Sequence, residues 1–583
     1  MLRRRWVVRA RDTGAWESIS RALGVSPLVA RVLEARGLAA GEPAGSVERF
    51  LRPRLRDLPD PVGIPGMAGA ARRVADAVRH GDPIWLYTDY DVDGVTSAAL
   101  LAEFLEACGA TPGIRLPRRD REGYGLHPEA VGEMAAQGAR VVITADCGIR
   151  AVEAARAARE LGVDLVVTDH HTPGPEVPVA AAVVNPRLPG SKYPDDALAG
   201  VGVAWNLAVA VRSVLREMGH FPEGTGPDLR ELLDLVAIGT VADVAPLVGV
   251  NRVLVAAGIE RINRTPRPGV RALAEVARVR GRVRAGNIGF QIGPRLNAAG
   301  RMQGPREALD VLRSRDMARA RELARVLDRV NRERQDSERR TVEAAAGRVD
   351  REGWWPDRWS LVVEGDGWHP GIVGLVASRL VERFHRPSVV LSRVEGRLKG
   401  SARSVRGLNL VEALSACSDL LARFGGHAAA AGLELRPDVA GDPAGVAAFR
   451  DRFEKAVRQA LSPEDLVPVL TADAEVGLDE LGPDAVRDLG VLEPFGVGNP
   501  RPLFVARDVR VLDVRPVGRE GAHLRFRVEQ GGAAFDAMAW RAGKGVRQVR
   551  PGRRVDLAFV PEVAEWKGVE RVRLVLEDVR PRE

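Results

Sequence analysis

Three short apolar runs, each followed at once by acidic or imidazole side chains, constrain the fold of this 583-residue chain more than any other feature. The runs cover residues 84–88, 141–145 and 165–168, and amphipathic helical patterns separate them. Strands that alternate with helices in this way form a parallel sheet covered by helices. Because the carboxyl ends of such strands line one crevice, the side chains that follow the three runs should converge. The sequence therefore predicts an α/β domain with a polar site at one edge of its sheet.

The first run is followed by three alternating aspartates, Asp89, Asp91 and Asp93. Such a cluster repels itself strongly, and a divalent cation is the simplest compensation. An EF-hand loop opens with the same D-x-D-x-D-G pattern, but its twelfth position should be Glu and is Leu100 here. A strand also precedes this motif where an EF-hand has a helix, so we reject the EF-hand. A solvated acidic turn is the alternative for this motif taken alone.

The second and third runs end in the same kind of residue, with Asp146 after the second and Asp169-His170-His171 after the third. A lone histidine is usually an ordinary surface or core residue. Three strand ends that present Asp or His together favour a metal site instead, and an oxygen-rich site with one imidazole favours Mn²⁺ or Mg²⁺. The cluster contains more carboxylate and imidazole groups than one divalent ion requires. Two ions ~3.5–4 Å apart would use it fully, and they would serve in-line attack on phosphoryl groups.

Composition narrows the class of protein. Hydrophobic residues make up 45% of the chain and charged residues 28%, which excludes a disordered polymer. The net charge of +8 is mild for this length, so it permits a nucleic-acid partner without requiring one. Only five of the 86 basic residues are lysines. Arginine binds phosphate through a bidentate fork, although a GC-rich genome also explains the bias.

Other site types are not supported. The three cysteines form no C-x-x-C pair, which argues against a disulfide framework or a cysteine zinc site and indicates a reducing compartment. The most apolar stretch, residues 199–211, is too short to span a membrane. The sequence from Gly200 superficially matches a dinucleotide-binding fingerprint, but its last position is Trp205 and no ribose-binding acid accompanies it.

Five regions follow from the change of pattern along the chain. We expect an N-terminal helical segment (1–60), a parallel-sheet domain (61–302), a long connecting helix (303–352), a smaller α/β domain (353–462) and a C-terminal β-barrel (463–583). Strands of the smaller domain are predicted at 360–364 and 388–392. Barrel strands are predicted at 504–511, 523–528, 534–540, 555–559 and 571–576.

The acidic motifs, together with a fourth at residues 235–243, resemble those of the DHH phosphoesterase superfamily. The match is closer to its RecJ branch of single-stranded-DNA-specific 5′→3′ exonucleases. Further similar segments are 122–126, 198–204, 293–301, 368–374, 400–404, 425–427 and 493–500. The resemblance therefore covers nearly the whole chain. It implies a DHH domain for 61–302, a DHHA1 domain for 353–462 and an OB-fold for 463–583.

The resemblance also implies the roles of the site residues. The implied ligands of two Mn²⁺ or Mg²⁺ ions are Asp91, Asp93, Asp146, His170 and Asp243, with Asp146 as the bridge. Asp89 is either a ligand or a residue that orients one, and the sequence leaves this open. His171 is expected to face the scissile phosphate, where an imidazole can donate a hydrogen bond to developing charge. Arg295 and Arg301 are the further catalytic candidates for contact with that phosphate.

Six residues are the candidate contacts with nucleic acid: Arg119, Tyr124, Ser401, Arg403, His427 and Trp566. We expect Arg119, Ser401 and Arg403 to bind the terminal 5′ phosphate by charge-assisted hydrogen bonds. An ordinary surface ion pair is the alternative for Arg403. Trp566 lies in a predicted turn of the barrel, where it would stack on bases or cap the core.

The expected function is therefore that of a single-stranded-DNA-specific 5′→3′ exonuclease, which releases 5′-mononucleotides by two-metal-ion hydrolysis in DNA repair and recombination. The 5′ polarity rests on the resemblance alone. We expect a monomer in the bacterial cytoplasm, without a membrane partner, and a single-stranded-DNA-binding protein and a helicase as candidate partners. The alternatives are a phosphodiesterase acting on oligoribonucleotides or cyclic dinucleotides, which the β-rich C-terminal region disfavours, and a non-catalytic DNA-binding replication scaffold, which the intact ligand positions disfavour.

Overall fold

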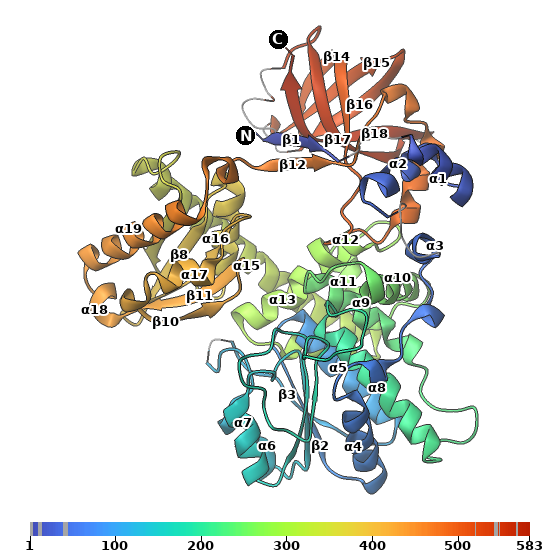
Figure 1. Ribbon diagram of the computed structural model, residues 1–583, viewed down its shortest axis with the longest axis vertical. Helices are drawn as coiled ribbons and strands as arrows, with labels where there is room; N and C mark the ends of the chain where they lie inside the picture. The colour runs from blue at the N-terminus through green and yellow to red at the C-terminus, as the bar shows by residue number, and fades with distance from the viewer. Residues whose placement is uncertain are drawn as a thin grey trace. The chain divides into compact units, whose positions relative to one another are not determined.

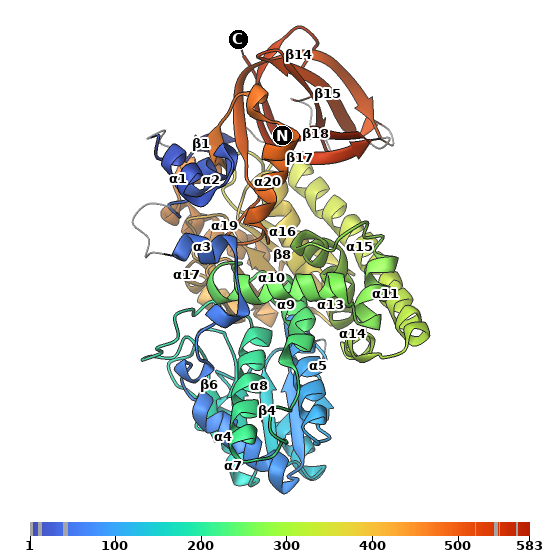
Figure 2. The same cartoon turned by 90° about the vertical axis from the view of Figure 1, so that its right-hand side faces the viewer.

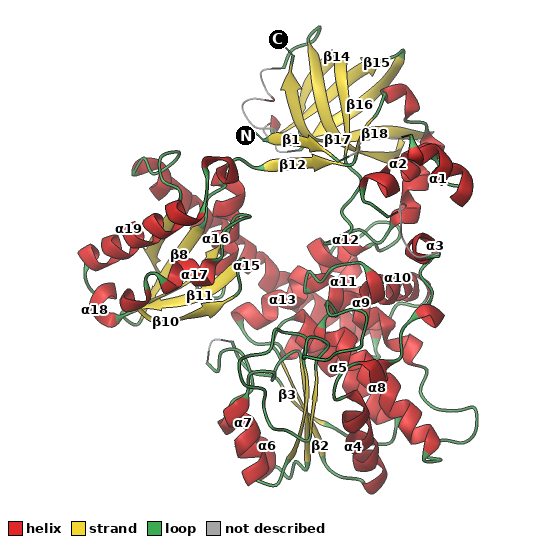
Figure 3. Ribbon diagram, viewed as in Figure 1, coloured by secondary structure: helices red, strands yellow, loops and turns green. Residues whose placement is uncertain are grey.

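The computed structural model describes residues 4–9, 14–38, 45–119, 121–518, 521–540, 546, 549–566 and 569–582. The chain divides into two compact units, and each is considered by itself. One unit, called the sheet unit here, comprises residues 53–336 and 494–500. The other, the barrel unit, comprises 1–52, 337–493 and 501–583. Figure 1 labels the elements along the chain, and Figure 3 shows which of them are helices and strands.

The sheet unit is built on a parallel sheet with the strand order β3-β2-β4-β5-β6. These strands are β3 (Gly113–Arg115), β2 (Ile84–Thr88), β4 (Val141–Ala145), β5 (Asp164–Thr168) and β6 (Ala182–Val184). The register pairs Thr88 with Ala145 and Ala145 with Thr168, so the three predicted strands end side by side. The structure thus confirms the predicted parallel sheet and the convergence of its carboxyl ends.

Helices cover both faces of this sheet (Figure 1). One face packs against α4 (Met67–His80), α5 (Val92–Ala107) and α8 (Gly200–Glu217), and the other against α6 (Pro128–Ala136) and α7 (Val152–Glu160). Along β4, Val141 and Ile143 enter the first core while Val142 enters the second. Because both faces are buried, β4 tolerates few polar residues, and this explains why its sequence reads as an apolar run.

Close packing fixes α5 against α9 (Leu233–Ala242), the helix that precedes Asp243. A Cβ atom on Gly239 of α9 would clash with Oγ1 of Thr96 on α5 and would lie 3.0 Å from Oδ1 of Asp93, so only glycine allows this approach. Farther along, the buried Arg267 guanidinium lies 2.7 Å from both Asp234 of α9 and Glu103 of α5. This buried ion cluster ties the two helices together at the ends remote from the strand termini.

The barrel unit contains a five-stranded sheet of order β10-β11-β9-β8-β7. Its strands are β7 (Leu361–Asp366), β8 (Ser388–Val394), β9 (Arg397–Arg403), β10 (Leu421–Gly426) and β11 (Ala430–Leu435). Helices α16 (Val373–Phe384) and α19 (Pro443–Ala460) belong to the same lobe. In the predicted connecting region, the structure has α14 (Arg306–Arg313) and then the 35-residue helix α15 (Met317–Arg351). Two helices therefore take the place of the single one expected.

The last strands form a closed barrel, because β14 pairs with both β15 and β17. These strands are β14 (Phe504–Val517), β15 (His523–Gln530), β16 (Ala533–Ala539), β17 (Arg554–Trp566) and β18 (Val569–Pro581). The predicted barrel is confirmed, with strands that extend beyond most of the predicted runs. Figure 2 shows the barrel strands from the side at right angles to Figure 1.

The N-terminal region begins with a strand that was not expected, and the expected short helices follow it as α1 (Ala15–Leu23), α2 (Pro27–Ala35) and α3 (Ser46–Leu51). Strand β1 (Arg5–Val8) pairs in parallel with β12 (Val469–Ala472). Trp6 donates a hydrogen bond from Nε1 to Asp578, at 2.8 Å, and the Arg580 guanidinium lies 4.2 Å from its ring centre. These partners are more than 450 residues away, so no local pattern could reveal the strand. None of the helices in the described part of the chain is long and apolar enough to cross a membrane.

Candidate metal centre

The structure gathers the predicted ligands at the carboxyl end of the parallel sheet. Potential ligand atoms lie within 4.8 Å of one another in three overlapping groups: Asp89, Asp91 and Asp146; Asp93, His170 and Asp243; and Asp146, Asp169, His170 and His171. Asp146 and His170 each belong to two groups. All six residues predicted as ligands are therefore brought together, from β2, β4, β5 and α9.

Backbone N–H groups hold the carboxylates of the first motif. Asp91 caps the N-terminus of α5, accepting hydrogen bonds from the N–H groups of Asp93 and Gly94 at 2.9 and 3.2 Å. Asp93 accepts from the N–H groups of Gly200 and Val201 at 2.7 and 2.8 Å. These are the first two residues of α8, whose N-terminus carries partial positive charge. The sequence pattern thus places each carboxylate where a helix end fixes its orientation.

Gly200 is a site residue that sequence reasoning missed. A Cβ atom there would lie 2.7 Å from Cβ of Asp146, so any other residue would push α8 away from the metal cluster. The sequence motif that begins at Gly200 suggests only dinucleotide binding, and the lack of that function gives no indication that Gly200 packs against Asp146. The sequence did contain one sign of this role, because Gly200 is the first residue of an apolar helix.

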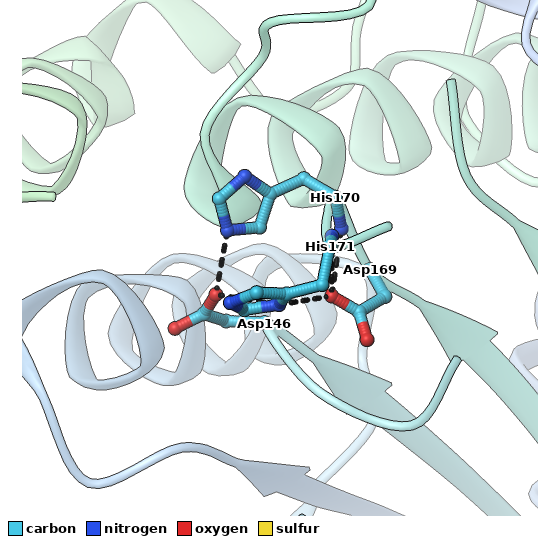
Figure 4. A group of neighbouring side chains, drawn as sticks. All are labelled: Asp146, Asp169, His170 and His171. Atoms are coloured by element: carbon cyan, nitrogen blue, oxygen red, sulfur yellow. Dashed lines mark hydrogen bonds and ion pairs between the residues drawn. The ribbon is translucent and has the colours of Figure 1, made fainter. Parts of the chain in front are cut away.

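Asp146 has an unusual backbone conformation and lies at the centre of the cluster. Its φ of 61° is in the left-handed region, which Asp tolerates better than most non-glycine residues. Nε2 of His170 lies 3.1 Å from Oδ1 of Asp146, and 4.0 Å from Oδ2 of both Asp93 and Asp243. Figure 4 shows the His170 ring directed at the Asp146 carboxylate. One imidazole nitrogen therefore faces three carboxylates.

Two buried polar atoms in this cluster make no hydrogen bond, and both are potential ligand atoms. They are Oδ1 of Asp89 and Nε2 of His170. Burial, the largest cause of its lowered pKa, keeps the His170 ring neutral, and no hydrogen bond engages its Nε2. A neutral ring can offer a lone pair at Nε2, as histidines that bind metals do. An oxygen-rich donor set with one imidazole and unsatisfied buried atoms fits Mn²⁺ or Mg²⁺.

The electrostatics of the protein groups also favour a cation. Burial and then the Asp91 charge raise the pKa of Asp93 to about 7, and burial and then the Asp93 charge raise the pKa of Asp243 to about 9. Burial and then neighbouring charge raise the pKa values of Asp89 and Asp146 well above the usual range. For His170, burial and then the neighbouring His171 lower the pKa to about 4, so the ring is neutral and able to coordinate. Divalent cations would offset the repulsion among these carboxylates.

His171 is oriented by Asp169, which was not among the predicted functional residues. The carboxylate of Asp169 accepts hydrogen bonds from Nδ1 of His171 (2.7 Å) and from the N–H groups of Ile149 and His170 (2.9 and 2.7 Å). Burial alone would raise the pKa of Asp169, but these hydrogen bonds outweigh it and lower the pKa. Burial opposes the charged form of His171, but its bond to Asp169 raises the ring pKa. The hydroxyl of Tyr124 lies 3.0 Å from the same Nδ1.

The candidate arginines of the sheet unit differ in their surroundings. Helix α13 (Gly293–Met302) packs on the loop of the first motif, with Asn297 accepting from the N–H of Val92 at 3.3 Å. Arg301 of this helix is half-buried, and desolvation followed by the charge of Arg119 lowers its pKa to about 10. Arg119 lies over the Tyr90 ring, 5.4 Å from its centre. Arg295 instead forms a 2.8 Å ion pair with Asp328 of α15.

In the barrel unit, Ser401 and Arg403 lie together on β9. A Cβ atom on Gly374, in the first turn of α16, would lie 2.9 Å from Nη2 of Arg403 and 3.3 Å from Oγ of Ser401. Two side-chain donors thus meet at a helix N-terminus, an arrangement that suits an anion. His427 follows β10, and its N–H donates to Ala430.

The candidate aromatic contacts of the barrel are only partly described. Trp566 pairs through its backbone with Val569 at the end of β17, but its side chain lies outside the described residues. Trp540 is 48% exposed, and its ring meets the His523 ring edge-on at 4.9 Å. Phe526 is buried in the barrel, as the alternation along its strand predicts.

Val244, directly after Asp243, ends α9 in a strained conformation. Its φ is 64°, its N–H donates to Val241, and the N–H of Ala245 donates to Thr240. This is a Schellman ending, in which glycine normally occupies the left-handed position. A left-handed conformation costs a residue with a Cβ atom roughly 1–2 kcal/mol. The side chain is 63% exposed, so burial does not offset that cost.

Models of three protein families match the chain. The DHH family N-terminal domain matches residues 83–240, the DHHA1 domain matches 359–459, and the RecJ OB domain matches 472–578. The last match identifies the observed barrel as the predicted OB-fold. These three matches follow one another along the chain in the order that the sequence motifs predicted.

Curated relatives and a solved structure extend the similarity over nearly the whole chain. The chain is 37% identical to the single-stranded-DNA-specific exonuclease RecJ of Bacillus subtilis, covering 98% of this chain and 70% of that protein. It is 36% identical to the protein of the same name from Escherichia coli, covering 95% and 96%. The crystal structure of RecJ in complex with Mn²⁺ from Thermus thermophilus matches with a TM-score of 0.83 at 33% identity, covering 99% and 80%.

Cation binding should be visible as stabilisation of the folded protein. Saturating Mn²⁺, at about 100 times its dissociation constant, should add ~2.7 kcal/mol, which raises the thermal unfolding midpoint of the sheet unit by roughly 4–5 °C. Asp146→Asn removes one repelling charge and a ligand, so the metal-free variant should be at least as stable as the parent. Its rise with Mn²⁺ should be under ~2 °C.

Differential scanning calorimetry with and without Mn²⁺ measures both effects. Asp196→Asn is the matched control, because it changes an exposed aspartate outside the cluster and should keep the full rise. A full rise in Asp146→Asn would contradict the assignment of Asp146 to the metal centre.

Proposed function

The chain belongs to the family of RecJ single-stranded-DNA-specific exonucleases, and on that premise we propose that it degrades single-stranded DNA from the 5′ end and releases 5′-mononucleotides. The observation that carries this proposal is the converged set of Asp89, Asp91, Asp93, Asp146, His170 and Asp243 with its unsatisfied buried ligand atoms. A scaffold protein without catalysis would have no need to retain such a self-repelling cluster.

We assign two ion positions to the protein groups. Asp93, His170 and Asp243 would hold one ion, Asp89 and Asp91 would hold the other, and Asp146 would be shared. Asp89 is thereby proposed as a ligand, since it belongs to the group with Asp91 and Asp146 and its buried Oδ1 makes no hydrogen bond. Two Mn²⁺ or Mg²⁺ ions held there would supply an activated water and neutralise charge on the scissile phosphate.

His171 is the proposed hydrogen-bond donor to the scissile phosphate. Because Nδ1 is engaged by Asp169, Nε2 is the ring atom available to donate. The raised pKa of His171 favours the ring form that can donate through this nitrogen. Arg301, and Arg119 beside it, would attract the phosphate to the centre. Arg295 is proposed to act indirectly, by holding α13 against α15 through Asp328.

The 5′ phosphate is proposed to bind at Ser401, Arg403 and the N-terminus of α16. A bidentate guanidinium, a hydroxyl and a helix N-terminus together match the charge and geometry of a phosphate. Arg119, Tyr124 and His427 are further proposed contacts with the strand. The barrel would hold the rest of the strand by stacking bases on aromatic residues. The exposed Trp540 and the sequence candidate Trp566 are the proposed members.

The cellular setting is part of the proposal. Cys108, Cys147 and Cys417 are buried free thiols, which is typical of a reducing compartment such as the bacterial cytoplasm. An enzyme restricted to single strands would depend on a helicase to separate duplexes and would meet a single-stranded-DNA-binding protein on its substrate. We propose that it acts as a monomer in DNA repair and recombination.

Digestion of single strands labelled at either end, with Mn²⁺ or EDTA, tests the proposed activity. We expect loss of nucleotides from the 5′ end only, and none in EDTA. Arg403→Ala should lower kcat/KM for 5′-phosphorylated strands by about 10–100-fold relative to 5′-hydroxyl strands, since a charged hydrogen bond is lost. Arg397→Ala, on the same strand and 61% exposed, should leave this ratio unchanged.

Degradation from the 3′ end would contradict the proposed polarity. An unaltered preference for 5′-phosphorylated strands in Arg403→Ala would remove Arg403 from the end-binding pocket while leaving the activity itself in place.

His171→Ala should reduce kcat by about 10²–10³-fold with a smaller change in KM, because its hydrogen bond forms mainly in the transition state. Asp169→Asn should act in the same direction, because it removes the acceptor that orients the ring. Both variants should keep the stabilisation by Mn²⁺, which separates them from ligand variants. His127→Ala, an exposed histidine in the same unit, is the control. Steady-state kinetics with wild-type kcat in His171→Ala would exclude it from the mechanism.

A further inference from the structure

Two exposed apolar side chains, Phe290 and Val244, lie on segments next to the proposed ligand Asp243, and the proposed mechanism uses neither of them. Phe290 is 86% exposed, which makes it the most exposed large hydrophobic residue among those described. Val244 is 63% exposed and follows the proposed ligand Asp243 directly. Exposure of a large aromatic side chain to water is unfavourable, and a ring as exposed as that of Phe290 is accessible to a ligand that could cover it.

Phe290 lies in a π-helical turn, η4 (Ile288–Ile292), between α12 (Ala285–Asn287) and α13. Such turns are rare and occur frequently at functional sites. The turn packs on the last turn of α9: a Cβ atom on Gly289 would lie 3.5 Å from Val241, and one on Gly293 would lie 3.3 Å from Ala242. In both Figure 1 and Figure 2, α9 and α13 lie side by side. The turn that carries Phe290 therefore packs against the last turn of α9, which Val244 ends.

Both residues lie on segments next to the proposed ligand Asp243: Val244 follows it directly, and the turn that carries Phe290 packs on the two residues before it. Oδ2 of Asp243 lies 4.0 Å from Nε2 of His170, and the Asp243 side chain is 25% exposed, so the metal centre opens to solvent on this side. Val241, Ala242 and Gly289 are half-buried, so the surface between Asp243 and Phe290 is apolar and accessible. A strand whose phosphate lies at the centre would place an adjacent sugar and base along this surface.

Backbone strain at Val244 is a second observation that supports a ligand contact here, and it is independent of the exposure of Phe290. Glycine would adopt the left-handed conformation that ends α9 without strain. The Val244 side chain is exposed, so its burial does not compensate for the strain. Folding alone therefore gives no reason for a β-branched residue here. Retained strain beside a functional site is consistent with a side chain that contacts a ligand.

We propose that Phe290, with Val244 beside it, forms a stacking surface for a base of the single strand next to the scissile phosphate. The proposal rests on the proposed exonuclease function and assigns it a specificity residue. A phenyl ring stacks on any base, because every base has a π-face, so the contact would be independent of sequence. Bases in a duplex are already paired and stacked, so the same contact would favour single strands.

The test compares Phe290→Ala with Phe290→Trp on normal strands and on strands with abasic residues at the three 5′-terminal positions. In EDTA, where turnover is absent, affinity is measured by fluorescence anisotropy, and kcat/KM is then measured with Mn²⁺. Phe290→Ala should weaken binding to normal strands by about 5–100-fold, the range for loss of one stacked base, and should match the parent on abasic strands. Phe290→Trp should retain the affinity. Leu161→Ala, which changes another exposed apolar residue, should have no effect on either strand.

Val244→Gly provides a readout that a purely structural role would not produce. It should raise the thermal unfolding midpoint, because strain is relieved, and at the same time weaken binding to normal strands.

Equal affinity of Phe290→Ala and the parent for normal strands would overturn the proposal. So would a loss that is equal on normal and abasic strands, or a change in thermal stability or oligomeric state without a change in binding, since these would indicate a protein contact in place of a base. If the parent binds strands but does not cleave them, the proposed exonuclease function is contradicted. The anisotropy comparison of Phe290→Ala with the parent still tests the stacking contact in that case.

Discussion

The mutual repulsion of the carboxylates at the ends of β2, β4 and α9 is the constraint on which the rest of this structure depends. Burial makes the repulsion stronger, as the raised pKa values of Asp93 and Asp243 show. The protein compensates part of it with backbone groups, since the N-terminus of α8 donates two hydrogen bonds to Asp93. These contacts orient the carboxylates but do not neutralise them. Divalent cations neutralise the remaining negative charge of the carboxylates. The same cations supply the chemistry of phosphodiester hydrolysis.

The scaffold sustains this cluster through close approaches and local strain. Gly200 and Gly239 allow α8 and α9 to pack directly on Asp146 and Asp93. The buried Arg267 ties α5 to α9 at their far ends, where breaking a buried ion cluster would cost several kcal/mol. Backbone strain is also present at the site, in the left-handed conformations of Asp146 and Val244. Tight packing away from the metal centre thus holds the helices together, while the backbone strain lies at the centre itself.

The sequence predicted the features that local pattern controls. The strands at 84–88 and 141–145 begin and end as predicted, because both are buried on two faces and read as apolar runs. Convergence of the ligands followed from parallel topology. Strand β1 was missed because its partner β12 lies more than 450 residues away. The roles of Gly200 and Asp169 were also missed, because they depend on a close approach and a hydrogen bond that only the folded chain defines.

Counting the bound ions tests the central claim most directly. Titration of Mn²⁺ into the full chain, followed by electron paramagnetic resonance, reports both the number of ions and whether they couple magnetically. The account predicts two ions per chain with a spin-coupled spectrum, since ions ~3.5–4 Å apart interact, and one uncoupled ion in Asp243→Asn. A single uncoupled ion in the unaltered protein, or two coupled ions in Asp243→Asn, would contradict it.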